Sequence, residues 1–237
     1  MSTISQLFSD IPLLLMRIPI VLLALSAHEA AHGYMAYRLG DTTAKSMGRL
    51  TLNPLKHLDP LGPLMRFLFG FGWARPVPIM TRHFKKPKRD MALTAIAGPI
   101  SNLLLALIGV FLSRLFVAVL TAADVVTEYN GAQYIMAESS FVINLIMYTA
   151  MFLELFYWLN VSLAIFNLLP IPPLDGSRFF LTFLPTRLYF EVMRYEHIIR
   201  IVLLVALWAG FLDRPLRYLV MLVTGAMNAL VGLIPFL

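Results

Sequence analysis

IPLLLMRIPIVLLALSAHEAAHGYMAYRL, residues 11–39, is a long apolar stretch that carries one compact polar motif, HEAAH, at residues 28–32. It is longer than the roughly 20 residues that a helix needs to cross a hydrocarbon core. On a helix, residues four apart share a face, so His28 and His32 can bind one metal ion together. Glu29 lies about 100° around the helix, close enough to act as a base on a metal-bound water. The stretch predicts a membrane helix with a metal site.

Chance does not explain the motif, because the composition gives roughly 0.003 expected matches in a chain of this length. An unpaired charge in the middle of a membrane helix also costs roughly 2.5–3.5 kcal/mol. The alternative interpretation is a structural polar cluster that binds no metal.

The composition indicates a membrane protein. The 237 residues are 59% hydrophobic and only 14% charged, and the mean hydropathy is +0.77, far from a typical soluble domain. The chain has no cysteine, which excludes disulfides, thiolate chemistry and cysteine zinc sites. Its formal charge of +6 is concentrated in loops, where it sets topology and does not indicate nucleic acid. We expect one domain, residues 1–237.

The predicted fold is an all-α polytopic membrane protein with five or six membrane helices. A three-helix catalytic core is expected within about 11–180, followed by C-terminal helices within about 198–237. Leu61–Trp73 is apolar but too short to cross unaided, and it predicts a short re-entrant or β-hairpin-like loop. The five expected helical segments are Ile11–Leu39, Met91–Leu120, Ser139–Leu169, Ile198–Leu212 and Tyr218–Leu237.

The charges of the loops predict how the chain is oriented in a cell membrane. Loops 38–90 and 170–200 are rich in Lys and Arg, whereas loop 121–138 has neither. The positive-inside rule therefore places the first two loops in the cytoplasm. Within the first of them, the run Arg82 to Arg89 is expected to anchor on anionic lipid. His28 precedes Arg38 by a distance that puts it roughly 15 Å below the cytoplasmic boundary.

A third metal ligand is expected near residue 170, where the chain returns to the same side of the membrane. A catalytic zinc ion usually has three protein ligands and one open position. Asp175 follows three prolines and precedes Gly176, so the backbone can turn there and present the carboxylate. A Zn²⁺ ion with two neutral histidines, Asp175 and Glu29 is electrically neutral, which is the least costly state in a poor dielectric. The alternative for Asp175 is an ordinary surface turn.

Three motifs in this order resemble the site-2 protease family of intramembrane zinc metalloproteases: HEAAH at 28–32, AGPISN at 97–102 and NLLPIPPLDG at 167–176. The stretches at 50–62 and 72–78 are similar to its compact prokaryotic branch, which lacks PDZ and CBS domains. The resemblance covers about residues 20–180. It implies that His28, His32 and Asp175 bind zinc, that Glu29 is catalytic, and that Asn102 helps to hold the scissile carbonyl or oxyanion. Ser177 stands where the family often has a second glycine.

Several polar residues have simpler interpretations. Asn102 could instead bond across helices, as amides do in membrane bundles. His57 and Asn53 are expected to be ordinary loop residues. Glu154 is expected to be a paired or protonated structural carboxylate rather than a proton relay. Arg17 is expected to extend to the outer interface.

The predicted function is hydrolysis of peptide bonds in or near the transmembrane helices of other proteins, with zinc as cofactor and Glu29 as general base. The expected partners are transmembrane substrates and membrane lipids but no nucleic acid, and assembly into a homo-oligomer is left open. Residues 70–79 are a candidate edge strand for an unwound substrate, with an interfacial anchor on Trp73 as the alternative. Two other functions fit a membrane His and carboxylate site: a zinc or ion transporter, and a pseudoprotease that only binds membrane helices.

Overall fold

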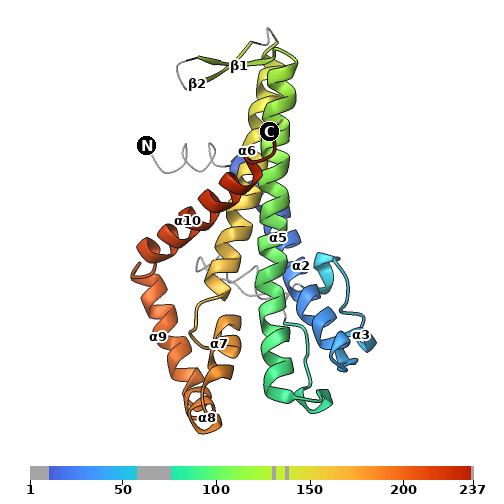
Figure 1. Ribbon diagram of the computed structural model, residues 1–237, viewed down its shortest axis with the longest axis vertical. Coiled ribbons are helices and arrows are strands. Elements are labelled where there is room, and N and C mark those ends of the chain that lie inside the picture. The colour runs from blue at the N-terminus through green and yellow to red at the C-terminus, as the bar shows by residue number, and fades with distance from the viewer. Residues whose placement is uncertain (1–10, 58–75, 130–131, 137–138, 236–237) are drawn as a thin grey trace.

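Three long helices form the framework of the protein. The structure, a computed structural model, describes residues 11–57, 76–129, 132–136 and 139–235. Helices α2 (Ile11–Arg38), α5 (Pro87–Ala122) and α6 (Ser140–Asn167) are each long and apolar enough to cross a membrane. Both α2 and α6 pack on α5, as Figure 1 shows. The prediction of an all-α membrane protein is confirmed, whereas a count of five or six spans stays a prediction.

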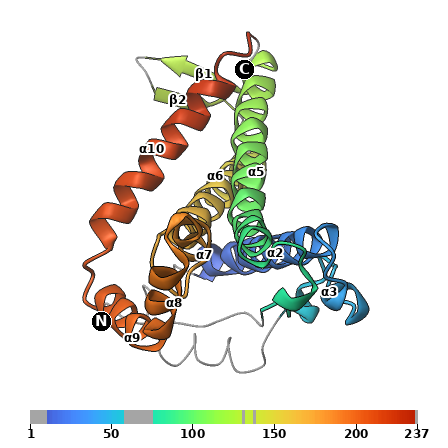
Figure 2. The same ribbon diagram turned by 60° about the horizontal axis from the view of Figure 1, so that its bottom comes forward.

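Shorter elements connect and extend this framework. Between α2 and α5 the chain forms α3 (Thr43–Ser46), η1 (Pro54–Lys56) and η2 (Thr81–His83). After α6 it forms α7 (Asp175–Phe180), η3 (Leu181–Phe183), α8 (Thr186–Arg194), α9 (Glu196–Trp208) and α10 (Asp213–Val231). Figure 2 shows α8, α9 and α10 as an arm that leaves the framework. The arm returns where α10 packs on α5 and α6.

Small side chains let α5 and α6 approach closely, which is how membrane helices associate without a hydrophobic driving force. A methyl group added at Gly109 of α5 would lie 2.8 Å from Phe156 Cδ1 on α6. One turn away, Ala106 of α5 and Val161 of α6 are completely buried, and Val220 of α10 completes the cluster. The same packing brings Asn102 of α5 and Asn160 of α6 into hydrogen-bond contact.

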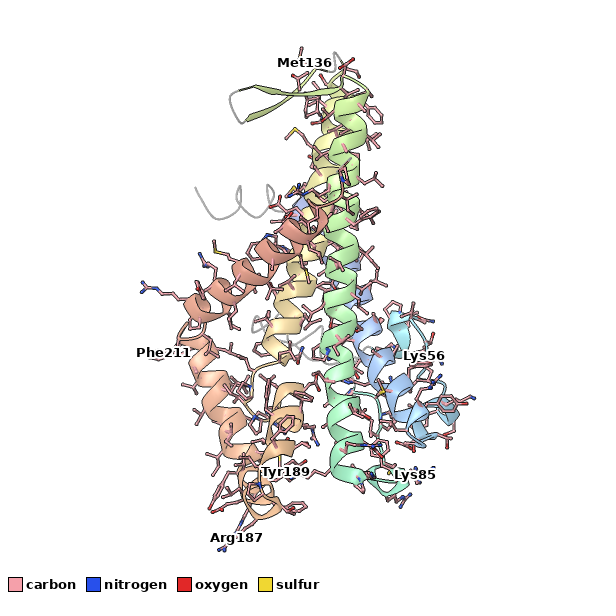
Figure 3. The ribbon with its side chains drawn as sticks, in the orientation of Figure 1. Lys56, Lys85, Met136, Arg187, Tyr189 and Phe211 are labelled. Carbon is pink, nitrogen blue, oxygen red and sulfur yellow. The ribbon has the colours of Figure 1, made fainter. Side chains whose placement is uncertain are left out.

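The loop between α5 and α6 contains a β-hairpin, which the charge pattern of that loop did not predict. Strand β1 (Val126–Tyr129) pairs antiparallel with β2 (Ala132–Ile135), with Val126 opposite Ile135. In Figure 3, Met136 beside the hairpin lies at one end of the molecule, and Lys85 and Arg187 lie at the other. The two basic loops therefore share one end, as the predicted topology requires. That this end faces the cytoplasm stays a prediction.

Two predicted features fall on residues that the structure does not describe. The re-entrant element at Leu61–Trp73 lies outside the described residues, and so does the first part of the candidate edge strand at 70–79. The described part of that strand, residues 76–79, runs without regular secondary structure. The edge-strand hypothesis therefore stays a prediction.

Candidate metal centre

Two histidines of α2 and one aspartate of α7 converge on a single point. Asp175 Oδ2 lies 3.0 Å from His28 Nε2 and 3.3 Å from His32 Nε2. The ligand atoms of the three residues all lie within 4.8 Å of one another. Both histidines are buried, with 4% and 7% of their surface exposed. The three residues predicted as metal ligands are thus brought together from segments almost 150 positions apart.

Each histidine is held by its second ring nitrogen. His28 Nδ1 lies 2.6 Å from Asn102 Oδ1, and His32 Nδ1 lies 2.8 Å from the backbone oxygen of Thr94. Both partners are oxygen atoms on α5 without a hydrogen to give, so each Nδ1 must donate. In the neutral ring this leaves the lone pair on Nε2, the nitrogen that faces Asp175. Such a bond from the far nitrogen is the usual support of a metal-binding histidine.

This arrangement fits a zinc ion. If both rings are neutral, two nitrogen lone pairs and a carboxylate oxygen face one another within 3.0–3.3 Å, and they repel unless a cation lies among them. Two imidazoles and one carboxylate are a common catalytic zinc set that leaves a fourth position open. With no cysteine in the chain, harder nitrogen and oxygen donors are the ligands available.

The turn before α7 places Asp175 against the helices. Gly176 passes so close to the end of α6 that an added methyl group would lie 2.2 Å from the backbone oxygen of Leu168. Ser177 is completely buried, and its hydroxyl donates to the oxygen of Leu174 over 2.7 Å. Helix α7 packs on α5. The sharp turn inferred from Pro and Gly is therefore packed in place, and it directs the carboxylate inward.

Gly98 lets α5 lie directly against the histidine rings. A methyl group at this position would lie 2.5 Å from His32 Nε2 and 2.7 Å from His28 Cε1. Non-bonded atoms do not approach that closely. Any larger residue would therefore push the rings away from the point at which the three ligand atoms converge. The glycine of the AGPISN motif thus has a steric role.

Glu29 is held by a backbone group of the loop that precedes α5. The N–H of Val77 donates to Glu29 Oε2 over 2.8 Å. Pro76 and Pro78 have no N–H, so Val77 supplies the only backbone donor in this three-residue stretch. The bond occupies one carboxylate oxygen of the half-buried Glu29 and fixes its direction.

Asp41 anchors that loop to the end of α2. Its completely buried carboxylate accepts from the N–H of Met80 over 2.7 Å, the N–H of Thr43 over 3.0 Å and His83 Nδ1 over 2.8 Å. Burial alone would raise the pKa of the Asp41 carboxyl, but the hydrogen bonds from His83, Thr43 and Met80 lower that pKa to about 2. Asp41 was not singled out from the sequence, because two of its partners, Met80 and His83, lie about 40 residues away.

Asn160 of α6 is a second residue near the site, after Asp41, that was not singled out from the sequence. Asn102 was predicted to hold the scissile carbonyl, and that role stays a prediction. Its observed contacts are with His28, with the Ala24 oxygen and with Asn160 of α6. Asn160 is completely buried in a mostly apolar helix, and an amide within a membrane span is the signal that could have found it, although α6 also contains Asn144 and Asn167.

The remaining polar candidates lie apart from the three ligands. His57 Nε2 lies 2.7 Å from the oxygen of Thr51, and Asn53 accepts from the N–H of Leu55 at the start of η1. Both contacts are within their own loop. Arg17 and Glu154 line a cavity of about 410 Å³ between α2 and α6, and Glu154 does not belong to the ligand cluster.

Comparisons with known proteins agree with the chemistry of the site. The sequence profile of peptidase family M50 matches residues 16–209, which include all three ligand candidates. A protein of Bacillus subtilis named "Putative zinc metalloprotease YwhC" is 46% identical over 169 residues, covering 70% of this chain and 69% of that protein.

Two further relatives carry the same designation under the name Rip2. The one from Mycolicibacterium smegmatis is 30% identical over 160 residues, covering 65% of this chain and 52% of that protein. The one from Mycobacterium tuberculosis H37Rv is 29% identical over 161 residues, with the same coverage. The match thus spans about half the length of each Rip2 protein. No solved structure shows significant similarity to the chain.

Proposed function

Because this chain belongs to peptidase family M50, we propose that it is an intramembrane zinc metalloendopeptidase that hydrolyses peptide bonds in or near transmembrane helices of other proteins. The observation that carries the proposal is the convergence of His28, His32 and Asp175 on one point, beside a glutamate one position after the first histidine. The names of the relatives support the zinc metalloprotease class. The membrane substrate is our own inference from the apolar helices around the site.

His28, His32 and Asp175 would hold the zinc ion, through the Nε2 atoms and Oδ2 that already face one another. When bound, zinc supplies a Lewis acid that polarises a water molecule and the scissile carbonyl. Asn102 Oδ1 and the Thr94 oxygen hold the proton of each neutral imidazole on Nδ1, which leaves the lone pair on Nε2. A wrong tautomer at either ring would remove a ligand.

Glu29 would carry the proton. Val77 N–H binds Oε2, and we assign proton transfer to the other oxygen, Oε1. Oε1 accepts a proton from the attacking water and then gives it to the leaving amine. The hydrogen bond from Val77 restricts rotation of the carboxylate, which keeps Oε1 in a constant direction through both transfers.

The substrate must be unwound before it is cut. A peptide bond inside a helix is shielded by its own turn, and its N–H and C=O groups need new partners as soon as the helix opens in a membrane. The site lies where α2, α5 and α7 meet, roughly 15 Å from the predicted cytoplasmic boundary. Water is expected to reach it from that side.

One reconstitution experiment separates this function from its alternatives. The full chain is placed in liposomes with a model transmembrane substrate, and fragments are identified by mass spectrometry while zinc flux is followed with an internal dye. We expect cleavage inside or next to the membrane segment, loss of cleavage on zinc chelation, and no flux. Flux without cleavage would indicate a transporter. Substrate binding without cleavage by the zinc-loaded wild type would indicate a pseudoprotease.

A further inference from the structure

A chain of buried side-chain hydrogen bonds crosses three helices and ends at a metal ligand. It runs from the backbone oxygen of Phe156 through Asn160 on α6 and Asn102 on α5 to His28 on α2. We refer to these four groups as the amide relay. Asn160 and Asn102 are completely buried, and His28 is 4% exposed. Polar groups in such a place are costly unless each is satisfied.

Each hydrogen bond of the amide relay is donated towards α6 and its Phe156 oxygen. Asn160 Nδ2 donates to the oxygen of Phe156 over 2.9 Å, which turns Asn160 Oδ1 towards α5. Asn102 Nδ2 then donates to that Oδ1 and to the oxygen of Ala24, both over 3.0 Å. This leaves Asn102 Oδ1 facing His28 Nδ1 at 2.6 Å. The backbone oxygens of Phe156 and Ala24 cannot donate, so these two acceptors fix the orientation of the Asn160 and Asn102 amides.

Turning either side-chain amide by 180° would leave polar atoms of the relay without hydrogen-bond partners. If Asn102 were turned around, its NH₂ group would face His28 Nδ1, which could accept only if the ring moved its proton to Nε2, and its Oδ1 would face the oxygens of Ala24 and Asn160. A proton on Nε2 would remove the lone pair that faces Asp175. The tautomer of His28 is therefore set by the Asn102 amide, which is oriented by Asn160 on α6 together with the Ala24 oxygen on α2.

We propose that Asn160 is a positioning residue for the metal centre: acting through Asn102, it holds His28 in the tautomer whose Nε2 binds zinc. This rests on the zinc site proposed above. Asn160 does not touch metal or substrate. It supplies the acceptor that orients the Asn102 amide, and without that acceptor Asn102 is held on this side only by the Ala24 oxygen.

The chain offers a control for the general effect of an asparagine in a membrane helix. Asn228 of α10 donates to the oxygen of Thr224, four residues earlier, over 3.0 Å. Asn160 makes the same bond to Phe156 on its own helix. The difference is the second bond of Asn160, to Asn102; within the described residues, the Asn228 side chain makes no bond to another helix. Leucine at either position keeps the size and removes the amide.

The test measures zinc affinity in the purified full chain by competition with a chromogenic chelator. Loss of a group that supports a metal ligand weakens binding by about 10–100-fold, and we expect a loss of about 10-fold or more for Asn160→Leu. Asn102→Leu should lose at least as much, and the Asn102→Leu/Asn160→Leu double variant no more than Asn102→Leu alone. Asn228→Leu should bind zinc like the wild type. Asn160→Ser keeps a bond to its own helix but cannot reach α5, so it should repeat the loss if leucine prevents folding.

The outcomes distinguish this inference from the proposed function. If the wild type binds no zinc, the metalloprotease proposal fails. If the wild type binds zinc and Asn160→Leu and Asn160→Ser bind it equally well, the relay is wrong. If the losses of Asn160→Leu and Asn102→Leu multiply in the double variant, Asn160 acts independently of Asn102 and the relay is also wrong. A lower melting temperature of the zinc-free variants with unchanged zinc affinity would indicate a purely structural role and would overturn the proposal.

Discussion

The backbone N–H of Val77 donates to Glu29 Oε2 over 2.8 Å, so a loop next to the membrane helices holds the residue to which we assign proton transfer. Two prolines flank this donor, and Asp41 fixes the following residues through Met80 and His83. The position of Glu29 therefore depends on a segment nearly 50 positions away as well as on its own helix.

Glu29→Gln should abolish cleavage and leave zinc binding intact. The amide oxygen of glutamine can still accept from Val77, but the side chain cannot take a proton from water, and general base catalysis contributes about 10²–10⁴-fold to rate. Turnover of the model substrate and zinc content are measured on the same preparation. Turnover close to that of the wild type would refute the role of Glu29 as general base.

Gly98→Ala should weaken zinc binding and activity together, because the added methyl group would lie within 2.5–2.7 Å of both imidazole rings. Overpacking of this kind costs about 1–3 kcal/mol. Gly225→Ala in α10 is the matched control, since nothing lies within 4 Å of its added methyl group. Zinc titration and cleavage are compared for both variants. Equal zinc affinity and equal cleavage rates in Gly98→Ala and Gly225→Ala would mean that the imidazole rings are not packed against α5.

Asp41→Asn should lower stability at neutral pH by about 2 kcal/mol, the range for hydrogen bonds to a charged group. The wild type should lose this extra stability over Asp41→Asn as the pH becomes acidic. The pKa of Asp41 is lowered from 3.8 to about 2 in the folded protein, so its contribution is fully present above about pH 4 and is lost as the pH falls towards 2. Thermal unfolding of both proteins in detergent, between pH 7 and pH 2, tests this. A difference that stays constant or grows in acid would contradict the assignment.

Single cysteines test the topology, and the chain has none of its own. Thr127 in β1 and Lys86 before α5 are both exposed, and they belong to opposite ends of α5. In intact cells an impermeant maleimide should label Thr127→Cys and not Lys86→Cys. Labelling of both after the cells are opened is the control for reactivity. The reverse pattern would place the basic loops and the metal centre near the outer face.

Local sequence patterns predicted the parts of the site that are set by local geometry. His28 and His32 are one helical turn apart, so their shared face follows from the helix itself. Asp175 could be predicted because prolines and a glycine force a turn at one place. The end of α2, expected at residue 39 and observed at Arg38, follows from hydropathy alone.

The other contacts of the site depend on how segments that are distant in the sequence pack together. Asn160 is one of three asparagines in α6, and only the packing of α6 on α5 shows which of them contacts Asn102. Asp41 and Val77 likewise act on partners about 40–50 positions away. The hairpin at 126–135 has a local signal, since Asn130-Gly131 between β-forming residues strongly favours a hairpin. The prediction for that loop rested on its charge alone and therefore did not include the hairpin.

X-ray absorption at the zinc edge, on the zinc-loaded wild type and on Asp175→Ala, is the most direct test of the metal centre. The wild type should bind one zinc ion per chain, with two imidazole nitrogens at about 2.0–2.1 Å and oxygen ligands completing the shell. Asp175→Ala should lose most of its zinc, because a third ligand and its charge are removed. Full zinc occupancy in Asp175→Ala, or a wild-type spectrum without imidazole scattering, would show that His28, His32 and Asp175 do not form the site.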